Sequence, residues 1–129
     1  LLVVIAIIGI LSAIVLASLS TARDKAQESK VSGQLSSMRA AAEIVYGNTN
    51  NTYGASATCA GLPFNDSGSG MASLVNASNY FGAVTCGSNN VSWAVSAPLK
   101  NNAWCADSTG ASRRVNTATT NNQFSCPTS

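Results

Sequence analysis

The chain has 129 residues, of which 46% are hydrophobic and 9% are charged, and its formal net charge is +2. This charge is too small to indicate nucleic acid as the main partner, and without histidine the chain has no imidazole for acid–base catalysis. Its four cysteines form no Cys-x-x-Cys pair, which argues against a zinc site. They are typical of two disulfides in an oxidising compartment, with four free buried thiols as the alternative.

The chain opens with an uninterrupted apolar run. Leu1–Leu19 carries no charge and no proline, and Ser12 and Ser18 are its only polar side chains. As a helix with a rise of about 1.5 Å per residue it would be about 28 Å long, close to the ~30 Å hydrocarbon thickness of a bilayer. The run can therefore span a membrane. A cleaved signal peptide is the alternative, but such peptides normally have a basic start and a shorter apolar run.

A polar, helix-compatible stretch follows without a break. Between residues 21 and 46, apolar residues recur at steps of four and three, which predicts one apolar helix face that packs on a sheet. This face consists of Val31, Leu35, Met38, Ala42 and Val45. We expect a single helix from Leu1 to Tyr46, ended by the cap Gly47-Asn48, whose first half makes almost no contacts within the chain.

Beyond a polar loop, the periodicity changes to two. A short helical turn is expected at Met71–Asn76, and the odd positions of Val91–Val95 are expected to face the core. Asp107–Gly110 reads as a hairpin turn. The strand candidates are Phe81–Cys86, Val91–Ala97, Ala103–Asp107 and Ser112–Val115, with a candidate edge strand at Asn121–Cys126.

The predicted fold class is therefore α+β, with a long N-terminal helix and a small, disulfide-stabilised antiparallel sheet as head. Three segments are expected: residues 1–20 as the apolar half of the helix, 21–46 as its amphipathic half, and 47–129 as the loop and sheet.

Four cysteines allow three disulfide connectivities, and spacing alone does not choose between them. We favour Cys59–Cys86 with Cys105–Cys126. The second bridge ties down a C-terminal tail rich in Thr and Asn that buries little, and the first joins an irregular loop to a strand end. The crossed arrangement, Cys59–Cys105 with Cys86–Cys126, is the second choice.

The apolar run also carries a family resemblance. Leu-Leu-Val-Val-Ile-Ala-Ile-Ile-Gly-Ile-Leu at Leu1–Leu11, continued by Ser12-Ala13-Ile14-Val15, closely resembles the processed N-terminus of type IV pilins and pseudopilins. In that family a Gly cleavage site, a methylated Phe and a Glu precede the residue that matches Leu1, so the role of the Glu is assigned to no residue here. Many bacterial pilins carry a Pro at the position of Ala17, and this chain does not.

The resemblance implies a major type IV pilin, a structural subunit that polymerises with identical subunits into a helical filament for adhesion or twitching motility. The precursor would lie in the inner or cytoplasmic membrane until the pilus assembly machinery moves it into an extracellular pilus on the cell surface. Surface glycans are candidate partners. The residues implied for the membrane and then the filament core are Leu1, Leu2, Val3, Val4, Ile5, Ala6, Ile7, Ile8, Gly9, Ile10, Leu11, Ala13, Ile14, Val15 and Leu16.

Three alternatives share the apolar helix: a pseudopilin of a type II secretion system, a subunit of a DNA-uptake pilus, and a membrane-anchored binding protein that never polymerises. An enzyme is not expected. The five acidic residues are scattered, no serine or threonine has an activating partner in its motif, and the loop around Asp66 has one carboxylate, which makes a poor calcium site. The sequence therefore predicts no catalytic residue, no metal and no cofactor.

Overall fold

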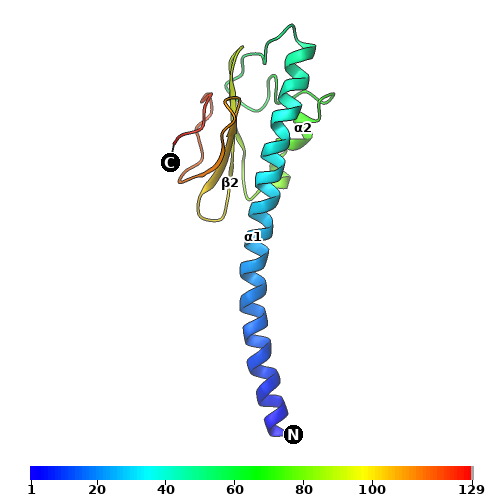
Figure 1. Cartoon of the computed structure of the whole chain (residues 1–129), viewed down its shortest axis with the longest axis vertical. Coiled ribbons are helices and arrows are strands. Elements are labelled where there is room, and N and C mark those ends of the chain that lie inside the picture. The colour runs from blue at the N-terminus through cyan, green and yellow to red at the C-terminus, as the bar shows by residue number, and fades with distance from the viewer. Residues whose placement is uncertain (129) are drawn as a thin grey trace. The chain divides into compact units, whose positions relative to one another are not determined.

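The computed structural model describes residues 1–128. It contains the α-helices α1 (Leu2–Asn48) and α2 (Met71–Leu74), the short 3-10 helix η1 (Ala77–Asn79), and four strands (Figure 1). The strands are β1 (Thr85–Ser88), β2 (Trp93–Pro98), β3 (Ala103–Asp107) and β4 (Ser112–Val115). The predicted α+β class is confirmed, and α1 ends two residues beyond the predicted Tyr46.

The chain divides into two compact units, Leu1–Lys30 and the unit that starts at Val31. Helix α1 runs through both. Residues 21–30 belong to the same helix as the apolar run, and none of them is buried.

In the second unit, the strands form one antiparallel sheet in the order β1-β2-β3-β4. Cys86 lies opposite Val95, and Val95 lies opposite Ala106, so these three side chains share one face of the sheet. The observed bounds of β3 and β4 are those predicted from the sequence. The sheet is thus a simple meander, in which each strand pairs with its neighbour along the chain.

The first two strands begin later than predicted. Residues 77–79 form η1, and the buried Tyr80 donates its hydroxyl to the Leu74 carbonyl, so the chain enters the sheet only at Thr85. Val91 is 77% exposed and does not face the core. It lies in the turn between β1 and β2, where the Asn89 side chain accepts the Val91 N–H at 2.9 Å.

The predicted edge strand at Asn121–Cys126 is wrong. The backbone of Asn122 is left-handed, with φ of 69°, which interrupts an extended strand. Asn122 donates its N–H to the carbonyl of Cys86 at 3.2 Å, and the Asn121 side chain accepts the Cys86 N–H at 3.2 Å. The C-terminal tail therefore covers the outer edge of β1 through single hydrogen bonds and forms no ladder.

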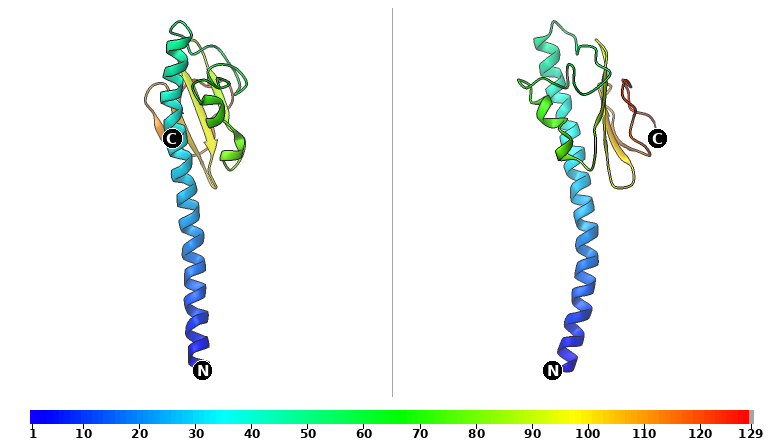
Figure 2. Two further views of the ribbon diagram at one scale, coloured as in Figure 1. Left: turned by 90° about the vertical axis from the view of Figure 1, so that its right-hand side faces the viewer. Right: turned by 180° about the vertical axis from the view of Figure 1, so that it is seen from behind.

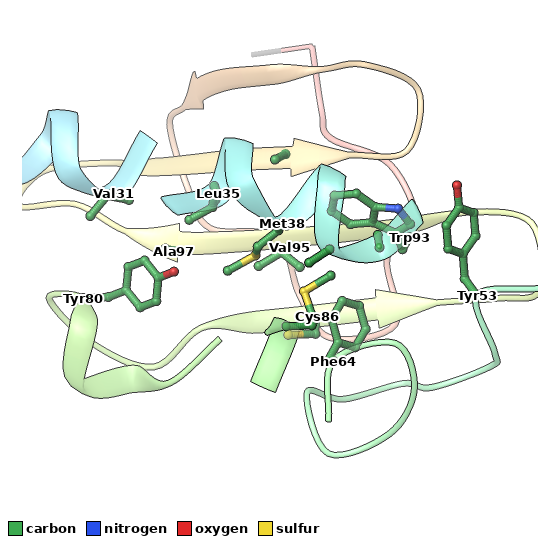
Figure 3. Close-up of a cluster of buried hydrophobic side chains, with 14 of the residues drawn as sticks. Val31, Leu35, Met38, Tyr53, Phe64, Tyr80, Cys86, Trp93, Val95 and Ala97 are labelled. Atoms are coloured by element: carbon green, nitrogen blue, oxygen red, sulfur yellow. The ribbon is translucent and has the colours of Figure 1, made fainter. Parts of the chain in front are cut away.

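The main core lies between the C-terminal part of α1 and the sheet. The predicted helix face is buried, with Val31, Leu35, Met38 and Ala42 at 0% exposure. Figure 3 shows the first three of these beside side chains from the sheet. Other buried members of the same cluster come from α2, β1, β2 and the connecting segments: Tyr53, Phe64, Met71, Tyr80, Cys86, Trp93, Val95 and Ala97.

A second, smaller cluster lies on the opposite face of the sheet, which the C-terminal tail covers (Figures 1 and 2). It consists of Ala103, Cys105, Val115 and Cys126. The tail approaches so closely that a Cβ placed on Gly87 would lie 2.3 Å from the carbonyl oxygen of Gln123. With both faces covered, residues 93–97 of β2 are all buried.

Candidate functional site

The most exposed apolar surface of the described chain lies on the first unit. Each large apolar side chain in Leu1–Leu19 is more than half exposed, from 51% at Ile7 to 100% at Leu1. The most apolar 18-residue window of α1 has a mean hydropathy of 3.0, and none of it is buried. By length and composition, α1 can cross a membrane. A helix that is apolar all round requires a nonaqueous environment, because only burial in protein or lipid covers every face.

Small side chains interrupt this surface at helical spacing. Ala6, Gly9, Ser12, Ala13 and Ala17 lie three, four or one residue apart along the helix. A Cβ added at Gly9 would meet nothing within 4 Å, so no contact within the chain requires glycine there. Small residues allow a second helix to approach closely in apolar surroundings.

The apolar surface ends where charges begin. Arg23, Asp24 and Lys25 follow Leu19 within six residues, and Glu28 and Lys30 complete the first unit. Charged groups are costly inside a bilayer, so these charged residues limit the segment that lipid can cover to the part of the helix that precedes them, Leu1–Leu19.

In the second unit, two disulfides stabilise the small head. Cys59 is bonded to Cys86 with a Cα–Cα distance of 5.0 Å, and Cys105 is bonded to Cys126 at 5.8 Å. These are the pairs favoured from the sequence. The first bridge joins the loop after α1 to β1, and the second joins β3 to the C-terminal tail, so both tie irregular segments to the sheet.

Polar contacts attach α1 to the hairpin of β3 and β4. The guanidinium of Arg39 donates to the carbonyl of Ala111 at 3.1 Å. The hydroxyls of Ser36 and Ser112 lie 3.3 Å apart, and the Trp104 indole N–H donates to Ser112 at 3.0 Å. The contacts of Arg39 and Ser36 join α1 to the hairpin, and the bond between Trp104 and Ser112 lies within the hairpin.

A further polar contact anchors the loop that follows α1. The Tyr53 hydroxyl donates to a carboxylate oxygen of Glu43 at 2.6 Å. Burial and this hydrogen bond together raise the pKa of Tyr53 to about 12, so the phenol remains protonated at physiological pH. The contact is structural, because Tyr53 is only 7% exposed.

Sequence reasoning missed Asp107. This carboxyl is 1% exposed, yet four hydrogen bonds reach it from Thr109, Ala111 and Cys126. Burial by itself would raise the pKa of Asp107, but the hydrogen bonds from Cys126, Thr109 and Ala111 outweigh it and hold the pKa below its ordinary value. The Asp-Ser-Thr-Gly sequence is typical of a turn in which the aspartate binds residues just after it, such as Thr109. It gives no indication of the hydrogen bond from Cys126, which lies 19 residues away.

Elsewhere in residues 1–128, acidic side chains are dispersed. The described residues contain no group of three or more His, Cys, Asp or Glu side chains that could hold a metal ion. Asp66 accepts the N–H of Ser69 at 2.7 Å, and hydrogen bonding to Ser69 lowers its pKa. That carboxylate therefore stabilises its own loop.

Comparison with protein-family models, with curated proteins and with solved structures finds no match to this chain. The similarity to pilins therefore rests on the N-terminal motif described above and on architecture. A long N-terminal apolar helix, packed through its C-terminal part on a four-stranded antiparallel sheet with two disulfides, is a pilin-like fold. The apolar helix and the disulfides together suggest a membrane-associated or secreted protein.

Proposed function

We propose that this chain is a structural subunit of a type IV pilus, and that it polymerises with identical copies through Leu1–Leu19. In this account the apolar half of α1 first holds the precursor in the membrane. The pilus assembly machinery then transfers it into a filament, where it packs against the same segment of other copies.

The observation that carries the proposal is the exposure of the apolar helix. Thirteen large apolar side chains of Leu1–Leu19 are at least half exposed. At about 0.3–0.6 kcal/mol for each such residue, moving them into a membrane is favourable by about 4–8 kcal/mol. A core made of identical apolar helices offers a similar environment, so transfer from the bilayer to the filament need not expose this surface to water.

The head would coat the outside of the filament. Apart from the buried Asp107, few side chains of the head are charged. The two disulfides of the head suit an oxidising exterior. Adhesion and twitching motility would then be properties of the filament, with surface glycans as candidate partners. We propose no enzymatic activity for the subunit.

The direct test is electron microscopy of filaments sheared from the surface of cells that express the chain, with mass spectrometry of the sheared protein. We expect thin filaments whose main component is this chain and which disappear when its gene is deleted. A chain recovered only as a membrane-bound monomer would contradict the proposal. Filaments that form only when a secretion system is overproduced would instead favour the pseudopilin alternative.

A further inference from the structure

The buried acid Asp107 has no part in the proposed filament contacts. It is the last residue of β3, and its side chain lies on the face of the sheet that the C-terminal tail covers. Cys105 lies two residues earlier on the same strand, and alternate residues of a strand share a face. The carboxylate and the Cys105 sulfur therefore point toward the same segment of the tail.

One carboxylate oxygen is oriented by the hairpin alone. Asp107 Oδ1 accepts the backbone N–H of Thr109 at 2.9 Å, the Thr109 hydroxyl at 2.6 Å and the N–H of Ala111 at 3.2 Å. All three donors lie within four residues of Asp107. Gly110 has φ of 100°, which allows this turn without strain. The hairpin can thus hold the carboxylate in place before the tail arrives.

The other oxygen reaches the tail. Asp107 Oδ2 accepts the backbone N–H of Cys126 at 2.6 Å, in a buried setting where a hydrogen bond to a charged group is strong. The same residue, Cys126, is bonded through its sulfur to Cys105. A single acid therefore binds the backbone of the residue whose side chain closes the disulfide.

We propose that Asp107 is a positioning residue for the Cys105–Cys126 disulfide. Its carboxylate binds the backbone of residue 126 before oxidation and holds the sulfur of Cys126 beside that of Cys105. This inference does not depend on whether the chain forms filaments.

The same contact selects the connectivity. Cys86 also lies near the tail, since its backbone bonds to Asn121 and Asn122. Its side chain, however, belongs to the core on the helix side of the sheet, whereas Cys105 belongs to the cluster on the tail side. Cys126 held by Asp107 therefore meets Cys105, and the crossed Cys86–Cys126 bridge is disfavoured.

The chemistry is thiol–disulfide exchange with a small disulfide such as oxidised glutathione. The thiolate of one cysteine attacks a glutathione sulfur and releases one glutathione thiolate, which leaves a mixed disulfide. The second cysteine thiolate then attacks the protein sulfur of that mixed disulfide and displaces the second glutathione thiolate. The two cysteine protons end on two molecules of reduced glutathione, and Asp107 takes no part in the electron transfer.

The test uses the full chain in detergent, reduced and then equilibrated in glutathione buffers. For each cysteine pair, mass spectrometry of the oxidised and reduced forms gives the effective concentration of one thiol with respect to the other. This quantity is compared between the unchanged chain and Asp107→Asn. The variant keeps the shape of the side chain but places an amide where it cannot satisfy both Thr109 and Cys126. The matched control is Asp66→Asn, which changes another hydrogen-bonded aspartate, one that makes no contact with the tail in the observed hydrogen bonds.

We expect Asp107→Asn to lower the effective concentration of the Cys105–Cys126 pair about tenfold or more, as loss of one charge-assisted hydrogen bond predicts. The Cys59–Cys86 pair in Asp107→Asn, and the Cys105–Cys126 pair in Asp66→Asn, should change less than about threefold. Equal losses for both pairs would show a general loss of stability, and no loss for Cys105–Cys126 would show that Asp107 does not position it. Either result overturns the proposal.

A second measurement leaves Asp107 intact, so it does not depend on how Asp107→Asn folds. In the full chain with Cys105→Ser and Cys126→Ser, the backbone amide at position 126 can still donate to the carboxylate. We expect that amide to exchange its hydrogen at least about tenfold more slowly than an unstructured amide. Exchange at the unstructured rate would mean that the disulfide alone holds the tail, and it would overturn the proposal.

Discussion

Replacing Ala13 by aspartate places a charge in the middle of the apolar half of α1. Ala13 lies in the first compact unit, outside the core of the head. The change should therefore leave the head folded, with both disulfides formed. Its effect should fall on the surface that we propose to be covered first by lipid and then by other copies.

The magnitude follows from the exposed side chains. Insertion of Leu1–Leu19 is favourable by about 4–8 kcal/mol, and one aspartate near the helix centre costs about 2.5–3.5 kcal/mol on the same scale. The precursor should then still reach the membrane, but with a smaller margin. In a filament, the charge would be buried at every subunit, and Leu1–Leu19 contributes no basic side chain to pair with it. A penalty of about 3 kcal/mol weakens each subunit addition about 100-fold.

The assay is the yield of sheared filaments, counted by electron microscopy and quantified by immunoblot against the amount of chain in the membrane. The matched control is Ala22→Asp, which makes the same change on the same helix beyond the apolar run, next to Arg23 and Asp24. We expect filaments from Ala22→Asp and none from Ala13→Asp. Normal yield from Ala13→Asp, with the chain folded and present in the membrane, would refute the reasoning.

Three further predictions concern the head. Leu35→Ala truncates a side chain that is 0% exposed, so it should lower the free energy of unfolding by about 2–5 kcal/mol, as measured by urea denaturation in detergent. A loss below about 1 kcal/mol would contradict the observed packing. Gly87→Ala should detach the tail from β1 and speed proteolysis near Gln123, because the new Cβ would lie 2.3 Å from the carbonyl oxygen of Gln123. The control Gly33→Ala adds a Cβ that meets nothing within 4 Å, so it should instead stabilise α1 by about 0.5–1 kcal/mol. Equal behaviour of the two variants would argue against the tail contact. Folding lowers the pKa of Asp107, so the contribution of its carboxylate to stability should be complete above the ordinary aspartate pKa of about 3.9 and should be lost as the pH falls below that value through the folded pKa. Urea unfolding from pH 6 to pH 2 should show a steeper loss of unfolding free energy for the unchanged chain than for Asp107→Asn. Parallel curves would contradict the lowered pKa of Asp107.

Much of the helix and its packing face could be predicted from the sequence. The steps of four and three that connect Val31 to Val45 are local and repeat along one element, so periodicity identifies the buried face. Strands β3 and β4 were also predictable, because Asp107–Gly110 is a strong local turn signal between them. The pattern missed Ala41, a small residue that is buried beside the predicted face.

The parts that escaped prediction depend on contacts between distant segments. The tail has too few apolar residues to show a strand pattern. It is held by the Cys86 N–H, which donates to Asn121, by the Asn122 N–H, which donates to Cys86, and by the contacts of Cys126 with Asp107 and Cys105. Burial of both faces of β2 follows from that tail and could not be deduced from β2 itself. The role of Asp107 was hidden for the same reason, since its decisive partner lies 19 residues away.

The central claim is that Leu1–Leu19 is covered by the same segment of other copies. The most direct measurement is a cryo-electron microscopy reconstruction of the sheared filaments, at a resolution that traces side chains. The account predicts that density for Leu1–Leu19 lies at the filament axis, in contact only with helices of identical subunits, while the disulfide-bonded heads face solvent. Filaments in which this segment is absent from the axis, or in which another protein fills it, would contradict the account.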